Sequence, residues 1–82
     1  MSLEQDMMVG DNARRLMEDE TFQSVIDHLQ SDLMQQIALT AAADTLKREA
    51  LYFEHRGLSS VLIRLKALAD NGTYARHQRE KP

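Results

Sequence analysis

Residues 44–70 read DTLKREALYFEHRGLSSVLIRLKALAD, and this stretch decides the fold. Apolar residues recur in it at spacings of three, four and one, with a single five-residue step from Phe53 to Leu58. Such spacing lays an apolar stripe along one face of an α-helix. The stripe comprises Leu46, Ala50, Phe53, Leu58, Val61, Leu62, Leu65, Leu68 and Ala69. We predict one long helix over residues 44–71, which Asn71-Gly72 ends because both residue types tolerate the left-handed conformation that closes a helix.

The remaining chain must cover this stripe. A helix is predicted over residues 20–39, with Asp19 as its N-cap and an acidic first turn. Before it, residues 11–18 predict a short helix that Asp11 or Asn12 caps. Residues 1–10 and the basic residues 73–82 are predicted to be extended polar tails. The inward side chains of the two predicted helices are Ala13, Leu16, Met17, Phe22, Val25, Ile26, Leu29, Leu33 and Ile37, with Met34 as a further candidate.

The connection between the two longer helices leaves two interpretations open. There is no glycine between Gly10 and Gly57 and no proline before Pro82, so one continuous helix from 20 to 70 in a coiled coil is compatible with the sequence. We favour a turn near residues 38–43, where the stripe thins to alanines, with Thr40 or Asp44 capping the next helix. The expected fold is all-α: a single small domain, residues 1–82, forming an antiparallel helical hairpin with a short N-terminal helix and extended polar tails.

Gly57 lies inside the long predicted helix, where glycine costs about 1 kcal/mol relative to alanine. Two interpretations fit it. In the first, the helix is continuous, and either another helix approaches closely at Gly57 or the helix bends there. In the second, the helix ends at Arg56 and a new one starts with Ser59 or Ser60 as its cap. We favour a continuous helix, because the apolar spacing carries through the glycine.

Composition bounds the function. The chain has 82 residues, 43% of them hydrophobic, and no cysteine, which excludes disulfides, thiolate metal sites and thiol catalysis. No apolar run is long enough to span a bilayer, and the acidic start MSLEQDMMV predicts no signal peptide. A domain this small is expected to gain stability by self-association.

Charge is distributed unevenly along the chain. Its net value is −3, which argues mildly against a dedicated nucleic-acid binder. Residues 1–35 hold eight acids and two bases, whereas residues 36–82 hold five acids and eight bases. The two halves are expected to attract each other within the hairpin or between neighbouring copies.

No catalytic or ligand-binding pattern stands out. His28 and Asp32 share a helical face, but two ligands are too few for a metal site. No Gly-rich phosphate loop, nucleophile elbow or zinc-protease pattern is present. We therefore expect no enzyme activity, cofactor or metal. The residues predicted to contact a partner lie in the two tails: Met7, Met8, Val9, Tyr74, Arg76, Arg79 and Lys81.

Three segments carry a resemblance: ARRLMEDETFQ, TLKREALY and RLKALADNG, joined by a Thr–Asp turn. Together they resemble short α-helical proteins encoded among the virion structural genes of tailed bacteriophages and prophages. The matching positions are Ala13, Arg14, Leu16, Asp19, Phe22, Thr40, Asp44, Arg48, Glu49, Leu51, Tyr52, Leu65, Leu68 and Gly72. The resemblance implies an accessory component of a capsid, portal or tail, present in many copies, and brings no catalytic residues.

The sequence thus predicts a non-enzymatic structural or interaction protein of a multimeric assembly, a phage virion or virion-assembly component. Its partners would be larger subunits of that assembly or further copies of itself, and it would lie in the virion or the host cytoplasm. Two alternatives remain open. One is a small nucleic-acid-associated regulator that uses the basic C-terminal half. The other is an antitoxin-like or adaptor hairpin with one soluble partner.

Overall fold

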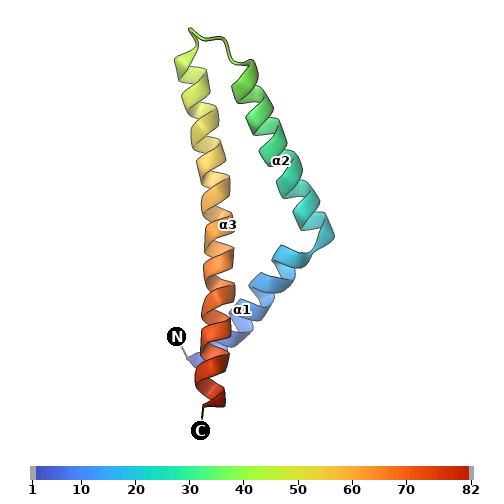
Figure 1. The fold of residues 1–82 in the computed structure, drawn as a ribbon, viewed down its shortest axis with the longest axis vertical. Coiled ribbons are helices and arrows are strands. Elements are labelled where there is room, and N and C mark those ends of the chain that lie inside the picture. The colour runs from blue at the N-terminus through green and yellow to red at the C-terminus, as the bar shows by residue number, and fades with distance from the viewer. Residues whose placement is uncertain (1, 82) are drawn as a thin grey trace.

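The computed structural model describes residues 2–81 and is all-α, as predicted. In the described chain, α1 spans Leu3–Glu18, α2 spans Glu20–Leu39 and α3 spans Thr45–Glu80. Helices α2 and α3 form an antiparallel hairpin along the upper half of the molecule, and α1 crosses the lower half of α3 (Figure 1). The molecule is elongated, with extents of 62 × 23 × 14 Å. Its long axis follows α3, and both other helices pack against this helix.

Each helix begins at a side chain that caps its free amides. The Asp19 carboxylate accepts from the Phe22 amide at 2.8 Å and the Asp44 carboxylate from the Lys47 amide at 3.2 Å. Both caps were expected from the sequence. Thr40, the other candidate for the cap of the last helix, instead ends α2 and donates its hydroxyl to the Gln36 carbonyl at 2.8 Å.

The turn between α2 and α3 is confirmed, and with it the hairpin rather than one continuous helix. Arg48 stabilises this turn from the first part of α3. Its guanidinium donates to the carbonyls of Ala41 and Ala42 at 2.8 and 3.3 Å. The Ala41 carbonyl also accepts from the Asp44 amide at 2.9 Å, so Arg48 adds a second bond there and supplies the Ala42 carbonyl with a donor.

The prediction for the N-terminal tail was wrong. Residues 3–10 are not extended but form the first two turns of α1, whose cap is Ser2 rather than Asp11 or Asn12. Ser2 accepts from the Gln5 amide at 3.1 Å, and the Gln5 side chain accepts in return from the Ser2 amide. This capping box provides acceptors for free amides at the start of α1. Contact with α3 then holds the segment in place. Residue 1 lies outside the described residues.

The prediction that Asn71-Gly72 ends the long helix was also wrong. Helix α3 continues to Glu80, so the expected basic tail is helical, with residue 82 outside the described part. None of the described residues has a positive φ, Gly72 included. Gly72 serves another purpose, because it is buried where α1 crosses α3.

Small residues form this crossing. Met7, Gly10 and Ala13 on α1 are buried against Ala69, Gly72 and Ala75 on α3. A Cβ added to Gly10 would lie 2.6 Å from the Gly72 Cα, and one added to Gly72 would lie 2.7 Å from the Gly10 Cα. The two backbones are therefore in direct contact, which only a glycine pair permits.

Polar side chains border the crossing. Arg76 donates to the Asp11 carboxylate at 2.7 Å, and Arg14 donates to the Thr73 hydroxyl at 2.6 Å. The acidic first part of the chain thus does meet the basic last part, as the charge distribution predicted. Both side chains of the Asp11–Arg76 pair remain more than 40% exposed, so the pair adds orientation more than stability.

Candidate functional site

Metal-ligating side chains do not converge in residues 2–81. No group of three histidine, aspartate or glutamate side chains is placed to hold a metal ion in this part of the chain. His28 and Asp32 are both exposed on α2. The candidate site of this protein must therefore be sought among its surfaces.

The partner-binding residues predicted from the tails lie together at one end of the molecule, where α1 crosses α3 and both termini lie (Figure 1). Met8 and Tyr74 are exposed there, at 58% and 66%. Met7 is not available to a partner, because it is only 9% exposed and packs in the crossing. That part of the prediction was wrong: a residue expected in a free tail belongs to the core of this chain.

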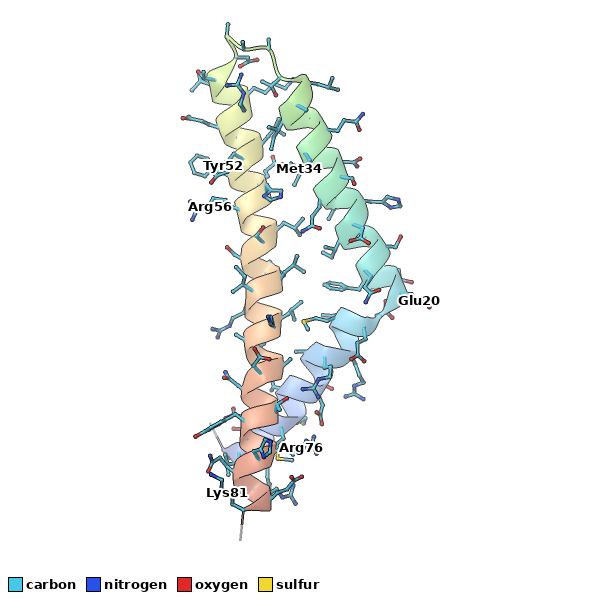
Figure 2. All side chains as sticks on the ribbon, in the orientation of Figure 1. Glu20, Met34, Tyr52, Arg56, Arg76 and Lys81 are labelled. Atoms are coloured by element: carbon cyan, nitrogen blue, oxygen red, sulfur yellow. The ribbon has the colours of Figure 1, made fainter. Side chains whose placement is uncertain are left out.

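The basic residues at the same end of the molecule differ in whether they are paired with an acidic side chain. Arg76 is held by Asp11 at 2.7 Å. Arg79 and Lys81 are exposed, in the last turn and at the C-cap of α3 (Figure 2 labels Arg76 and Lys81). Val9 is half-buried. The structure thus brings the two predicted segments together but leaves only part of each accessible.

The apolar residues of α3 lie on two faces of the helix and not on the single stripe that their spacing predicted. Leu58, Leu62 and Leu65 are partly covered, in line with the buried Ala69. Leu46, Phe53 and Val61 remain exposed at 80%, 64% and 53%. Leu51, which the stripe did not include, is buried at 8%.

The signal for this division was present in the sequence. A five-residue step turns a helix by about 500°, which leaves the later residue about 140° from the earlier one. The step from Phe53 to Leu58 therefore puts these two residues on different sides of α3, with Val61 between them. We call the exposed side the outer face; it comprises Leu46, Ala50, Phe53, Gly57 and Val61.

Gly57 lies in the middle of the outer face. The helix is continuous there, which confirms that it does not end at Arg56. A Cβ at this position would meet nothing within 4 Å, so no other helix of this chain approaches it. The neighbouring Arg56 projects from the side of α3 that faces away from α2 (Figure 2). Within this chain the cost of a mid-helix glycine, about 1 kcal/mol, has no compensating contact.

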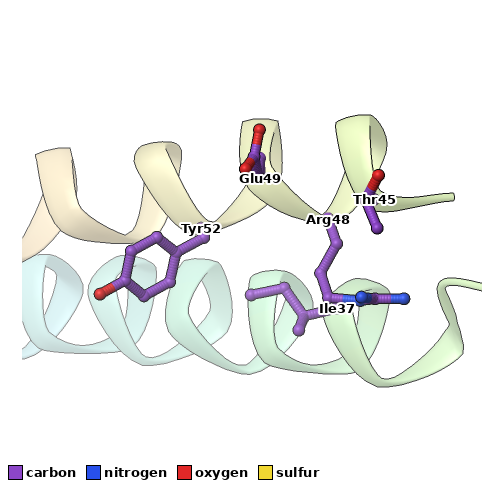
Figure 3. Close-up of a pocket in the computed structure, with 5 residues that line it drawn as sticks. All are labelled: Ile37, Thr45, Arg48, Glu49 and Tyr52. Atoms are coloured by element: carbon purple, nitrogen blue, oxygen red, sulfur yellow. The ribbon is translucent and has the colours of Figure 1, made fainter. Parts of the chain in front are cut away.

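An open hollow of about 310 Å³ lies where α2 ends and α3 begins (Figure 3). Its lining residues are Ile37, Thr45, Arg48, Glu49 and Tyr52. Arg48 is already bonded to the turn carbonyls. The hollow is best explained as the gap left by a turn that this arginine stabilises.

A second hollow, of about 190 Å³, lies where the elbow between α1 and α2 faces α3. Met17, Phe22 and Ile26 line it together with Leu62. Gln23 and Asp27 complete its lining, so the space between the elbow and α3 is left partly unfilled within this chain. The core of the described chain is correspondingly small: Met7, Ala13, Leu33, Leu51, Ala69 and Ala75.

Comparison with known proteins gives no relative: no protein-family description, curated protein or solved structure matches this chain. Among the described helices, none is both long enough and apolar enough to cross a membrane. The exposed apolar surface of α3 is thus the feature of this molecule that calls for a functional explanation.

Proposed function

We propose that this protein is a non-enzymatic structural component of a multimeric assembly and acts by docking its exposed apolar surface onto other subunits. The observation that carries the proposal is the exposure of large apolar side chains. Leu39 and Leu46 beside the hairpin turn are 77% and 80% exposed, and Phe53 is 64% exposed. Single exposed apolar side chains are ordinary, but several on one face of a helix, as Leu46, Phe53 and Val61 are on α3, are typical of an interaction surface.

The size of the core supports the same proposal. No large side chain in the described chain is fully buried. Small domains near this length are commonly stabilised by a disulfide, a metal or association, and this sequence has no cysteine. Contact with neighbouring subunits would complete the burial that the hairpin begins.

The resemblance to short helical proteins of tailed-phage structural gene clusters directs the proposal to a virion. In this proposal the chain is an accessory component of a capsid, portal or tail, located in the virion or, before assembly, in the host cytoplasm. Its elongated form, 62 Å along α3, suits a subunit that lies along larger neighbours. The asymmetric charge would set its orientation, because complementary charge governs register more than affinity.

The proposal is tested on particles. Phage particles released from cells that carry the gene are separated on a density gradient and probed with an antibody against this chain. We expect the chain to sediment with the particles at a constant ratio to the major capsid subunit. A chain that stays at the top of the gradient, clear of every particle and assembly intermediate, would contradict the proposal.

The alternative, a nucleic-acid-associated regulator, is tested on the free protein. Fewer of its basic side chains are free to bind phosphate than the sequence suggested, because Arg76 is paired with Asp11. We expect no appreciable affinity for duplex DNA at physiological salt. Salt-dependent DNA binding that the Arg76→Ala, Arg79→Ala and Lys81→Ala changes weaken would favour the regulator instead.

A further inference from the structure

We infer that the outer face of α3 is the contact surface of a homodimer, in which a second copy of α3 lies antiparallel across the first and the two helices cross at Gly57. The inference deepens and rests on the proposed function, since it names a partner for the exposed surface. Five observations on the chain carry it: the position of Gly57, the symmetry of the residues around it, their charges, the surface left exposed and the place where α1 docks.

The first observation is how this chain uses glycine. All three glycines lie inside helices. Gly10 and Gly72 form the point where two helix backbones touch. Gly57 has the same helical setting with no neighbour within 4 Å. A second helix crossing at Gly57 would give it the role that the other two glycines already have.

The second observation is the pattern on either side of Gly57. At about 100° per residue, the outer-face residues and Arg64 fall within a sector of about 80°. An antiparallel two-fold axis at Gly57 places residues equally far before and after it opposite each other. Phe53 then meets Val61 of the second copy, and Ala50 meets Arg64. Phe53 is thus opposed by a smaller side chain and Ala50 by the flexible Arg64, while Leu46 would meet Leu68.

Charge distinguishes the two possible orientations. In a parallel pair, Arg64 would face Arg64 of the second copy inside the contact, which like charge disfavours. In the antiparallel pair, Arg64 lies beside Glu49 of the second copy, because Glu49 falls one residue from the opposing position and on the same flank. The two-fold symmetry gives two equivalent Arg64–Glu49 pairs. The aliphatic part of each Arg64 side chain also covers apolar surface.

Surface area supports a second copy as the occupant. The chain exposes 6347 Å². A compact monomer of 9.4 kDa exposes about 5,000 Å². The excess, about 1,300 Å², exceeds the roughly 800 Å² that each partner buries in an interface of standard size. The chain as a whole therefore has enough uncovered surface for an interface of that size.

The outer face is also free of the rest of this chain. Helix α1 contacts α3 around Leu68, Ala69, Gly72 and Thr73, on the C-terminal side of the face. The buried side of the upper half of α3, marked by Leu51, lies about 120° around the helix from Gly57. Between Ala50 and Arg64 a second copy would meet none of the residues that α1 contacts, whereas Leu46 of the second copy would fall opposite Leu68, at the edge of the α1 contact.

The test begins with the full-length chain in sedimentation equilibrium across concentration. We expect a reversible dimer. Gly57→Ala should raise its dissociation constant at least tenfold, because a Cβ at the crossing separates the helices. The same change should not reduce helicity, since alanine favours a helix. A wild-type chain that stays monomeric, or a dimer indifferent to Gly57→Ala, would overturn the inference.

Charge reversal tests the pairing. Glu49→Arg and Arg64→Glu should each weaken the dimer, and the two changes in one chain should restore it. Lys66→Glu is the matched control, because residue 66 lies on the other side of α3 from the outer face and should leave association unchanged. Equal effects of Arg64→Glu and Lys66→Glu would show that net charge, not this contact, governs association and would overturn the pairing.

Cross-linking tests the orientation, since the chain has no cysteine of its own. Mixed Phe53→Cys and Val61→Cys chains should form a disulfide between different copies. Phe53→Cys alone should not, because its two copies would lie about 12 Å apart along the axis, beyond the reach of a disulfide. Ready self-cross-linking of Phe53→Cys would overturn the antiparallel arrangement. These measurements use purified protein, so the dimer can fail while the chain still sediments with particles, and the reverse.

Discussion

The lower crossing and the middle of α3 make an instructive comparison, because each contains glycine in regular helix. At the crossing, Gly10 and Gly72 face each other and their backbones touch. In the middle, Gly57 meets nothing within 4 Å. Glycine in a helix therefore marks a close approach only where a partner segment exists to make it. The same residue type stabilises one region of this molecule and weakens the other.

The apolar side chains around the glycines differ in the same way. At the crossing, Ala69 and Ala75 are 5% and 1% exposed. In the middle, Phe53 and Val61 are 64% and 53% exposed. The crossing is a finished contact made of small residues, and the outer face is an unfinished one made of large residues. Free energy of unfolding should therefore depend strongly on the first region and weakly on the second when the chain is monomeric.

The largest difference should come from one substitution made in both regions. Gly72→Ala places a Cβ within 2.9 Å of the Asp6 carbonyl and 2.7 Å of the Gly10 Cα, so α1 must move away. We expect a loss of about 1–3 kcal/mol in the free energy of unfolding. Gly57→Ala, measured where the chain is monomeric, should gain up to about 1 kcal/mol. Urea unfolding followed by circular dichroism measures both, and equal effects would contradict the comparison.

The next difference should come from two adjacent methionines of α1. Met7 is 9% exposed in the crossing, and Met8 is 58% exposed. Met7→Ala should lower the free energy of unfolding by about 2 kcal/mol, near the low end for a buried methionine because the site is at the edge of a small core. Met8→Ala should change it by less than about 0.5 kcal/mol. Thermal unfolding of the two variants in parallel provides the check, and a larger loss for Met8→Ala would place the core elsewhere.

Some features of this molecule can be predicted from its sequence, and others depend on contacts between segments that are distant in sequence. The hairpin, the range of α2 and the caps Asp19 and Asp44 could be read from local patterns, because capping and amphipathic spacing are local physics. The role of Gly72 could not, since its contact with Gly10 joins residues far apart in sequence. Considered locally, Asn71-Gly72 is a good helix end; only the approach of α1 makes it a helix interior.

The surface shows the same limit. Exposure of the outer face depends on which side of α3 the other helices occupy, and the broad stripe alone did not decide it. The five-residue step at Phe53 was the one local signal of a change of face. Met7 was assigned to a free tail for the reason that misplaced Gly72: its contact lies on a helix that is distant in sequence.

The smallest expected difference concerns two arginines, one in each region. Arg76 donates to Asp11 at 2.7 Å, and both side chains are more than 40% exposed. Arg76→Gln should therefore cost only about 0.5 kcal/mol, and the loss should shrink as salt rises because screening weakens the attraction that is removed. Arg64 has no such partner among the ion pairs of the described chain, so Arg64→Gln should leave the monomer unchanged at every salt concentration. Urea unfolding at low and high salt, below the concentration at which the chain associates, measures both. If Arg64→Gln were the more destabilising change in the monomer, the outer face would already be engaged within the chain, and the contrast between a finished and an unfinished contact would fail.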